Sequence, residues 1–376
     1  MRKIPWGLIG MIAFVVTGER FIANHRLDFT RPEGWEWRLN GENAKRKVKD
    51  AGVLAIGSSL VKLGIVPQAI EPVVGQPVYN LGMCAGPAPA SYFLLRRALF
   101  SGAKPAVVLV EFHPNTLMRS HWHTEGFWPD LLDSRETVEL SWTANDPRFF
   151  GVMMFSRWFP SVKDRHEVGS KLLGALQGKS TNYVGLLAMI RTMRKNQGAK
   201  IVPKSPEGPK AALPPEDIAF VADSWSCHPV NEVYVNRFFE LTRSRGIPVV
   251  WLMPPVRPDL QRLREKNGLD RDYQAFARRT KDRYPHVTVV DATRSAYPAD
   301  LFIDGMHLDR EGAMALSADL APILRNGAAR LSTGENRWVS LAAFRNQAPT
   351  VTIEDFGQSV EAILRLSEMP KSARTR

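Results

Sequence analysis

The sequence is poor in cysteine, since Cys84 and Cys227 are the only two in its 376 residues. Two thiols can form one disulfide at most, which excludes a small scaffold held together by disulfides. The paired cysteines of a structural zinc site are also absent. We therefore expect two buried or unpaired thiols, and neither a disulfide framework nor a cysteine-based metal site.

The sequence also lacks internal repeats and long low-complexity runs, and its composition of 44% hydrophobic and 23% charged residues is that of a globular protein. The net charge is +12, but lysine and arginine are spread along the chain rather than gathered in one run. No zinc-finger or RNP-like motif accompanies them. We therefore expect no nucleic-acid partner.

No apolar run at the N-terminus reaches the roughly 20 residues that a membrane-spanning helix needs. Arg2 and Lys3 instead precede a shorter apolar run over 4–16, which is typical of a secretory signal. No clear cleavage site follows, so the run can also serve as an uncleaved anchor. We expect a signal or anchor over 1–25 that associates with a membrane through 4–16, a polar connector over 26–50, and an exported or membrane-anchored, extracytoplasmic protein. The alternative is a cytoplasmic protein in which 4–16 is a core helix.

An alternation of short apolar runs and helix-length segments begins after the connector. The runs are apolar throughout, as strands buried on both faces are. The predicted strands are 53–57, 78–82, 106–112, 247–253 and 287–292. The predicted helices are 60–73, 88–101, 231–245, 271–284 and 309–324. This alternation predicts an α/β fold in which helices cover both faces of a parallel five-stranded sheet.

The connection between the third and fourth predicted strands is too long for a loop. We interpret 117–230 as an inserted, mostly helical cap with a flexible arm around 200–217, where proline and lysine are frequent. The core is then expected over 51–116 and 231–330, and 331–376 is a C-terminal extension. The tryptophans of the cap favour a small apolar core over a surface that stacks on sugars.

Polar residues follow the predicted strands at the edge where parallel α/β sheets bind their ligands. Ser59 follows the first strand, Gly82 ends the second and Asn115 comes shortly after the third, while Asp304 and His307 lie downstream of the fifth. A histidine can take the proton of a serine, and an aspartate can orient that histidine. A glycine N–H and an asparagine side chain can hold an oxyanion. These residue types together predict nucleophilic chemistry.

The same residues carry a resemblance to the SGNH, or GDSL-type, hydrolase superfamily. The segments GSSL, NLGMCAG, VVLVEFHPN and DGMH are similar to four sequence blocks of that family, in the family order, over about residues 50–326. The resemblance implies a three-layer α/β/α, flavodoxin-like fold with a large insertion after the third strand. It also implies a serine esterase, an acyl-ester hydrolase that needs no metal and no organic cofactor.

Aligned on these blocks, the resemblance implies a role for each candidate residue. Ser59 would be the nucleophile, His307 the base and Asp304 the residue that orients it. The oxyanion hole would combine the N–H groups of Ser59 and Gly82 with the side chain of Asn115. Taken singly, each residue has an ordinary structural interpretation, such as a helix cap or a turn, so the conjunction carries the hypothesis.

The sequence departs from the family pattern at three positions. Ser58 stands where the family has aspartate, His113 where it has glycine, and Thr116 where an aspartate follows the asparagine. Such departures resemble those of membrane-anchored SGNH-like proteins that modify envelope polymers, including D-alanine transfer and alginate acetylation proteins. The implied substrate is a small-molecule or carbohydrate ester, or an acylated cell-envelope polymer.

Two alternative functions and one alternative site stay open at this point. The chain can be an O-acyltransferase on an envelope glycan, or a catalytically inactive protein of the same fold that binds glycans or acts as a scaffold. His121 and His123 share a face if they lie on a strand, but no third metal ligand is near them in the sequence. We therefore expect no metal site.

Overall fold

The computed structural model describes residues 6–24, 31–159, 163, 183–206, 208, 212–219, 221, 224–330, 337–345 and 351–368. Its centre is a six-stranded sheet in the order β2-β1-β3-β4-β5-β6, with every neighbouring pair parallel. The strands are β1 (Val53–Ile56), β2 (Val78–Asn80), β3 (Val107–Val110), β4 (Val249–Met253), β5 (Val287–Asp291) and β6 (Trp338–Ser340). The first five strands follow the 2-1-3-4-5 order of one common doubly wound arrangement.

The expectation of five strands is wrong, because the sheet has a sixth. β6 (Trp338–Ser340) pairs in parallel with β5 through Val289 and Trp338. It is three residues long, lies at the edge of the sheet and is only partly buried. An edge strand of this kind needs no apolar run, so the pattern that marks the buried strands does not mark it.

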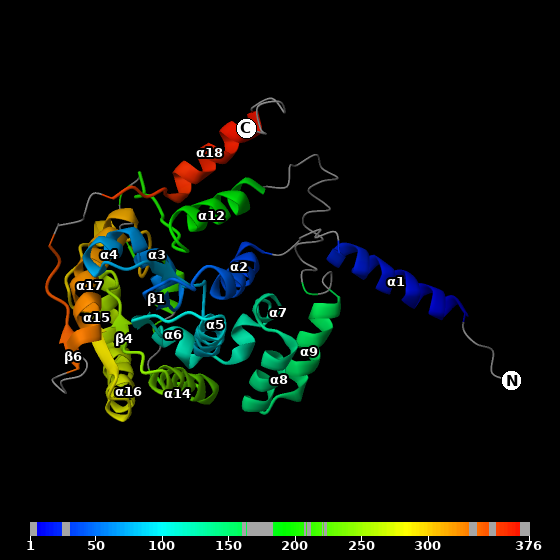
Figure 1. Ribbon diagram of the computed structural model, residues 1–376, viewed down its shortest axis with the longest axis horizontal. Helices are drawn as coiled ribbons and strands as arrows, with labels where there is room; N and C mark the ends of the chain where they lie inside the picture. Colours follow the sequence, from blue (N-terminus) through cyan, green and yellow to red (C-terminus); the bar gives the residue numbers. More distant parts are fainter. Residues whose placement is uncertain are drawn as a thin grey trace. The chain divides into compact units, whose positions relative to one another are not determined.

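The sheet is covered by helices on both faces, as the alternation of the sequence predicts. Val250 and Leu252 of β4 belong to an apolar cluster that also contains side chains of α3, α4 and α17. The ring of Trp251, between them, contacts Phe239 of α14 and Tyr273 of α16 on the opposite face. Helix α5 packs against α14 on that second face (Figure 1).

These covering helices match the predicted segments in place, although their ends differ. They are α3 (Ser59–Gly64), α4 (Pro67–Val74), α5 (Ala88–Phe100), α14 (Pro229–Ser244), α16 (Leu269–Arg283) and α17 (Arg310–Arg330). The single helix expected over 60–73 is divided, because Pro67 opens α4 and disfavours the helical conformation for Val66 before it. A further helix, α15 (Pro258–Lys266), follows β4 and was not expected.

By its internal contacts the chain divides into two compact units, 1–38 with 122–183 and 39–121 with 184–376. The second unit holds the sheet, α12 (Tyr183–Lys195, from Val184), α13 (Pro215–Ala219) and α18 (Phe356–Glu368). Short α6 (Pro114–Met118) also belongs to it. The segment expected to form one cap is thus shared between the two units. Parts of the expected arm around 200–217 lie outside the described residues.

The first unit has its own small core. Its helices are α1 (Trp6–Asn24), the start of α2 (Pro32–Arg46), α7 (Trp128–Leu131), α8 (Ser134–Thr143) and α9 (Pro147–Trp158). The ring of Trp37 meets that of fully buried Trp128 edge-on, with centroids 5.1 Å apart. Trp142 and Trp158, by contrast, are exposed. The tryptophans are therefore divided between core and surface.

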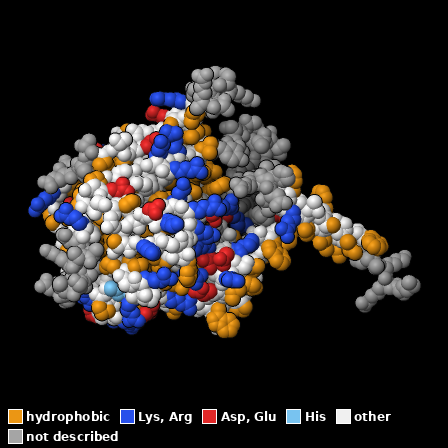
Figure 2. All heavy atoms as spheres, viewed as in Figure 1, with side chains coloured by type: hydrophobic (Ala, Val, Ile, Leu, Met, Phe, Trp, Pro, Cys, Tyr) orange, Lys and Arg blue, Asp and Glu red, His pale blue; other side chains and the backbone are white. Residues whose placement is uncertain are grey.

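Helix α1 carries most of the predicted signal or anchor segment over 1–25, of which residues 1–5 and 25 lie outside the described part of the chain. Most of its large apolar side chains are exposed, including Trp6 and Phe14 (Figure 2). Within the described residues, no helix joins sufficient length to sufficient apolarity to cross a membrane.

Candidate functional site

The turn between β1 and α3 places two serines at the carboxyl end of the sheet. Ser58 is the N-cap of α3, with extended backbone, and its Oγ accepts a hydrogen bond from the Leu60 N–H at 3.2 Å. Ser59 is the first residue of the helix. The two hydroxyl groups therefore differ in their contacts. The Ser58 hydroxyl caps the N-terminus of α3, whereas the Ser59 hydroxyl does not cap the helix and bonds to another residue.

That partner is His307, which the chain brings back from far downstream. Oγ of Ser59 lies 2.7 Å from Nε2 of His307, and Nδ1 of His307 lies 2.7 Å from Oδ2 of Asp304. The side chains of His307 and Asp304 are 20% and 28% exposed to solvent. The three groups form a continuous hydrogen-bonded chain that solvent, and hence a substrate, can reach.

The loop from Asp304 to His307 holds the imidazole by backbone bonds as well. Oδ1 of Asp304 accepts the N–H groups of Met306 and His307, both at 2.8 Å. Burial raises the pKa of Asp304, but the hydrogen bond and charge of His307 and the two backbone N–H groups outweigh it and bring the pKa below its ordinary value. Asp304 is therefore an ionised carboxylate whose Oδ2 is hydrogen-bonded to the imidazole of His307.

A carboxylate from the segment after β3 supports the same loop. Oδ2 of Asp217, in α13, accepts the Gly305 N–H at 2.8 Å. A Cβ on Gly305 would lie 2.8 Å from that oxygen, so a larger residue here would displace the Asp217 carboxyl. Burial raises the pKa of Asp217 above its ordinary value, although the Gly305 bond opposes the shift. Sequence reasoning missed Asp217, because nothing in the sequence links it to a loop some ninety residues later.

Two of the three predicted oxyanion donors have no acceptor. Within the described residues, neither the N–H of Ser59 nor the side chain of half-buried Asn115 makes a hydrogen bond. Asn115 lies in α6, directly after the carboxyl end of β3, which is the strand beside β1. Both groups are therefore free to donate to a developing oxyanion.

The third predicted donor, the N–H of Gly82, is already engaged. It donates to Oδ1 of Asn80 at 2.8 Å. A Cβ on Gly82 would lie 2.4 Å from the backbone N of Lys62, so close packing against α3 requires glycine here. A role for this N–H in holding an oxyanion would need the bond to Asn80 to be exchanged, and it stays a prediction.

Asn80 organises this corner more fully than the sequence suggests. Its Nδ2 donates to the carbonyls of Val61 and Ile65, both at 2.8 Å, while its Oδ1 accepts from Gly82. The side chain is fully buried. One amide therefore fixes α3, whose first residue is Ser59, to the end of β2.

Two titratable side chains are buried at the end of β3. Glu111 is 1% exposed, and its Oε2 accepts the Ser58 N–H at 2.8 Å. His113 is 7% exposed, and burial, with the charges of Arg264 and His307, keeps its pKa well below the ordinary value. His113 is therefore neutral near pH 7. Glu111 was not predicted as a site residue, although a charge within the apolar run AVVLVEF is a signal that could have found it.

A small cavity lies beside these residues. Its volume is about 10 Å³, which is room for about one water-sized group. It is lined by His113, Asn115, Asp217, Val221, Leu260, Arg264 and Met306. Its lining includes the candidate donor Asn115 and also Met306, which lies between Asp304 and His307 in the same loop.

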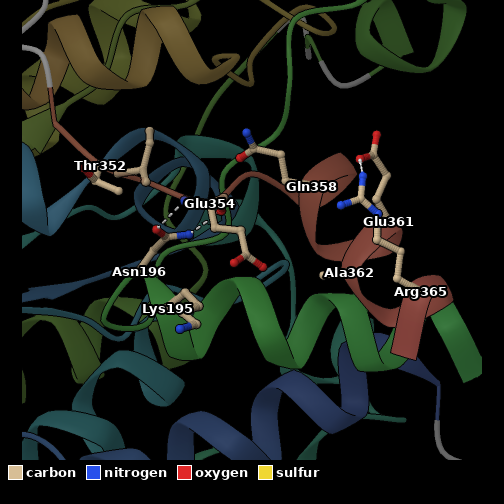
Figure 3. Close-up of a pocket in the computed structure, with 9 residues that line it drawn as sticks. Lys195, Asn196, Thr352, Glu354, Gln358, Glu361, Ala362 and Arg365 are labelled. Atoms are coloured by element: carbon tan, nitrogen blue, oxygen red, sulfur yellow. Dashed lines mark hydrogen bonds and ion pairs between the residues drawn. The ribbon is translucent and has the colours of Figure 1, made fainter. Parts of the chain in front are cut away.

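A larger groove of about 510 Å³ lies between α12 and α18 (Figure 3). It contains none of the candidate residues. Asn196 closes its floor by donating to the Glu354 carbonyl at 2.7 Å, and Glu354 pairs with Arg191. Glu361 and Arg365 of α18 pair with each other at its rim. In Figure 3, Asn196 thus joins the C-terminal segment to the rest of its unit, whereas Glu361 and Arg365 pair within α18.

The described residues offer no candidate metal site and no reactive thiol at Cys227. Within the described part of the chain, no group of three or more His, Cys, Asp and Glu side chains is arranged to hold a metal ion. His121 and His123 lie in a 3-10 helix, His121–Thr124, rather than on a strand. Burial raises the pKa of the Cys227 thiol to about 12, which makes it a poor nucleophile.

The arrangement has the parts that acyl transfer to serine requires. It holds a hydroxyl bonded to an imidazole, a carboxylate bonded to the other side of that imidazole, and two N–H donors that have no acceptor among the described residues. These groups come from the ends of β1 and β3 and from the loop before α17. The chain matches no model of a known protein family, and no curated protein matches it significantly.

Proposed function

We propose that this protein is a serine esterase of the SGNH type that hydrolyses acyl esters. The observation that carries the proposal is the unbroken chain from Ser59 Oγ through His307 to Asp304, with 2.7 Å at each link. A serine hydroxyl is a weak nucleophile until a base takes its proton. Both links lie within the range in which general-base catalysis operates.

In the proposed reaction, Ser59 Oγ attacks the ester carbonyl while His307 Nε2 takes its proton. The carbonyl oxygen becomes an oxyanion, which the N–H of Ser59 and the side chain of Asn115 stabilise. Protonated His307 then gives its proton to the departing alcohol, and an acyl ester on Ser59 remains. His307 next takes a proton from water, whose oxygen attacks the acyl carbon. The bond between that carbon and Ser59 Oγ then breaks, His307 returns the proton to Oγ, and the carboxylic acid leaves.

We propose acylated carbohydrate or an acylated envelope polymer as the substrate class. The open position of the site supports a large alcohol portion, since both His307 and Asp304 are partly exposed. The water-sized cavity beside Asn115 supports a small acyl portion.

Labelling with a fluorophosphonate probe tests the proposal, because this reagent forms a covalent bond with an activated serine. The wild-type protein should be labelled and Ser59→Ala should not. Ser58→Ala is the matched control, because it removes the neighbouring hydroxyl and a helix cap worth about 1 kcal/mol while leaving the nucleophile. Equal labelling of wild type and Ser59→Ala would contradict the proposal.

Export with membrane association through residues 4–16 is our proposal for the N-terminal segment. It is supported by the basic pair before the apolar run and by the exposed apolar side chains of α1. Separation of membrane and soluble fractions tests it. Recovery of the full chain wholly in the soluble cytoplasmic fraction would contradict it.

A further inference from the structure

One buried carboxyl at the site has no part in the reaction as proposed above. Glu111 directly follows β3, and its side chain is almost fully buried. Its Oε2 accepts the Ser58 N–H, while its Oε1 has no hydrogen-bond partner in the described part of the chain. Burying a carboxyl with so few donors costs free energy that an apolar side chain at this position would not cost.

The serine turn is built closely around this carboxyl. A Cβ on Gly57 would lie 2.9 Å from Oε2 of Glu111 and 2.9 Å from its carbonyl oxygen, so only glycine allows the approach. The Glu111 N–H also donates to the Ile56 carbonyl at 3.0 Å. Glu111 is thus hydrogen-bonded to the turn on both sides of Gly57, through its backbone N–H to Ile56 and through its side chain to Ser58.

Resting on the proposed esterase function, we propose that Glu111 is a positioning residue, whose carboxylate holds the Ser58 N–H and thereby fixes the N–H and Oγ of Ser59 toward the ester carbonyl and His307. The sequence has serine at 58, where the resembling family has aspartate. Glu111 places a carboxyl against that same residue from the neighbouring strand. Glu111 also interacts electrostatically with His307.

The ionisation of Glu111 is set by groups on several elements. Burial raises its pKa to about 7, against the lowering effects of the Ser58 hydrogen bonds and of the charges of His307 and Arg264. Tyr273 of α16 also interacts electrostatically with Glu111. Neutral His113 lies two residues further along the chain. The carboxylate form therefore becomes dominant above neutral pH, and its hydrogen bond to Ser58 is then charge-assisted and stronger.

The test compares wild type with Glu111→Gln, which keeps the shape of the side chain and removes its charge. We expect the fluorophosphonate labelling rate of wild type, divided by that of Glu111→Gln, to be close to 1 at pH 5.5 and about 10 at pH 8.5. The difference arises because one charge-assisted hydrogen bond is worth about 1.5 kcal/mol or more. A merely structural role would give the same ratio at every pH, and that result would overturn the proposal. Asp319→Asn is the control, because Asp319 is a partly buried carboxyl whose pKa burial also raises, and it is bonded to Tyr297 outside the site.

A second measurement does not depend on activity or on the folding of a variant. The amide proton resonance of Ser58 in the wild-type protein should move with pH, with a midpoint near 7, as Glu111 ionises. A Ser58 resonance that does not titrate would overturn the proposal. A wild-type protein that is not labelled at all would instead contradict the esterase function, and the Ser58 resonance would then still decide whether Glu111 holds the turn.

Discussion

Nε2 of His307 lies 2.7 Å from Oγ of Ser59, although 248 positions separate the two residues in the chain. The contact exists because both residues follow strands or loops at the carboxyl edge of one parallel sheet. Asp304 completes the chain from within the same short loop, where it is hydrogen-bonded to both the backbone and the ring of His307.

Asp304→Asn should reduce catalysis far more than it reduces stability. The amide would keep the shape of the side chain but could stabilise the wrong tautomer of His307 and could not favour its protonated form. We expect kcat on p-nitrophenyl acetate to fall about 10³ to 10⁴-fold. Because the pKa of Asp304 lies below its ordinary value, the wild-type carboxylate should stay ionised through the acid limb of the rate profile. A tenfold loss or less would contradict the orienting role.

Asn115→Ala tests the oxyanion donor that has no other partner. Loss of one such donor typically costs about 100 to 1,000-fold in kcat, with little change in KM, because the donor acts on the transition state. The thermal unfolding midpoint should barely move, since the side chain makes no hydrogen bond within the described residues. Gly82→Ala should do the opposite and destabilise the fold, because its Cβ would lie 2.4 Å from the Lys62 backbone N. Unchanged kcat in Asn115→Ala would remove that residue from the site.

Much of this site could be predicted from the sequence, because strand ends and short polar motifs are local patterns. The apolar runs 53–57 and 106–112 mark β1 and β3, and residues that follow parallel strands must meet at one edge. The catalytic roles of Ser59, His307 and Asp304 remain predictions, although their geometry is now known.

The remainder depends on tertiary contacts that leave no local pattern. Asp217 reaches Gly305 from a segment with no motif, and β6 joins the sheet with too few buried residues to show a period. Glu111 is different, since a carboxylate in an apolar strand is visible in the sequence. What the sequence does not show is that its side chain turns toward Ser58 and away from solvent.

We expect kcat/KM to fall as the acyl group of the ester becomes longer. The cavity lined by Asn115 has room for about one water-sized group, and we propose that it receives the acyl portion of the ester, which would favour acetyl over longer chains. We expect kcat/KM for p-nitrophenyl acetate to exceed that for the butyrate at least tenfold. Leu260→Ala, which enlarges the lining, should narrow the difference, whereas equal rates for both esters in wild type would show that the acyl group lies elsewhere.

Asn80→Ala should be among the most destabilising polar substitutions in the sheet unit. The side chain makes three hydrogen bonds with the backbone and is fully buried. Its removal takes the Asn80 partner from the Ile65 carbonyl and the Gly82 N–H, while the Val61 carbonyl keeps the Ile65 N–H. We expect a loss of about 3 kcal/mol in the free energy of unfolding by urea. Asn80→Asp should be no better, because it keeps the acceptor for Gly82 but places an oxygen against the carbonyls of Val61 and Ile65. A loss below about 1 kcal/mol would contradict this assignment.

Removal of the Glu111 charge should change how stability depends on pH. In the unfolded chain Glu111 ionises near its ordinary pKa of 4.5, whereas burial raises the pKa to about 7 in the folded protein. The stability linked to this group is therefore fully present below about pH 4.5 and is lost as pH rises through 7, by about 3 kcal/mol in all. Other groups cancel when wild type is compared with Glu111→Gln, so the variant should gain stability relative to wild type across this interval. Urea unfolding of both proteins at pH 4.5, 6 and 8 measures the difference. A difference that stays constant would show that Glu111 is not buried as an ionisable carboxyl beneath the serine turn.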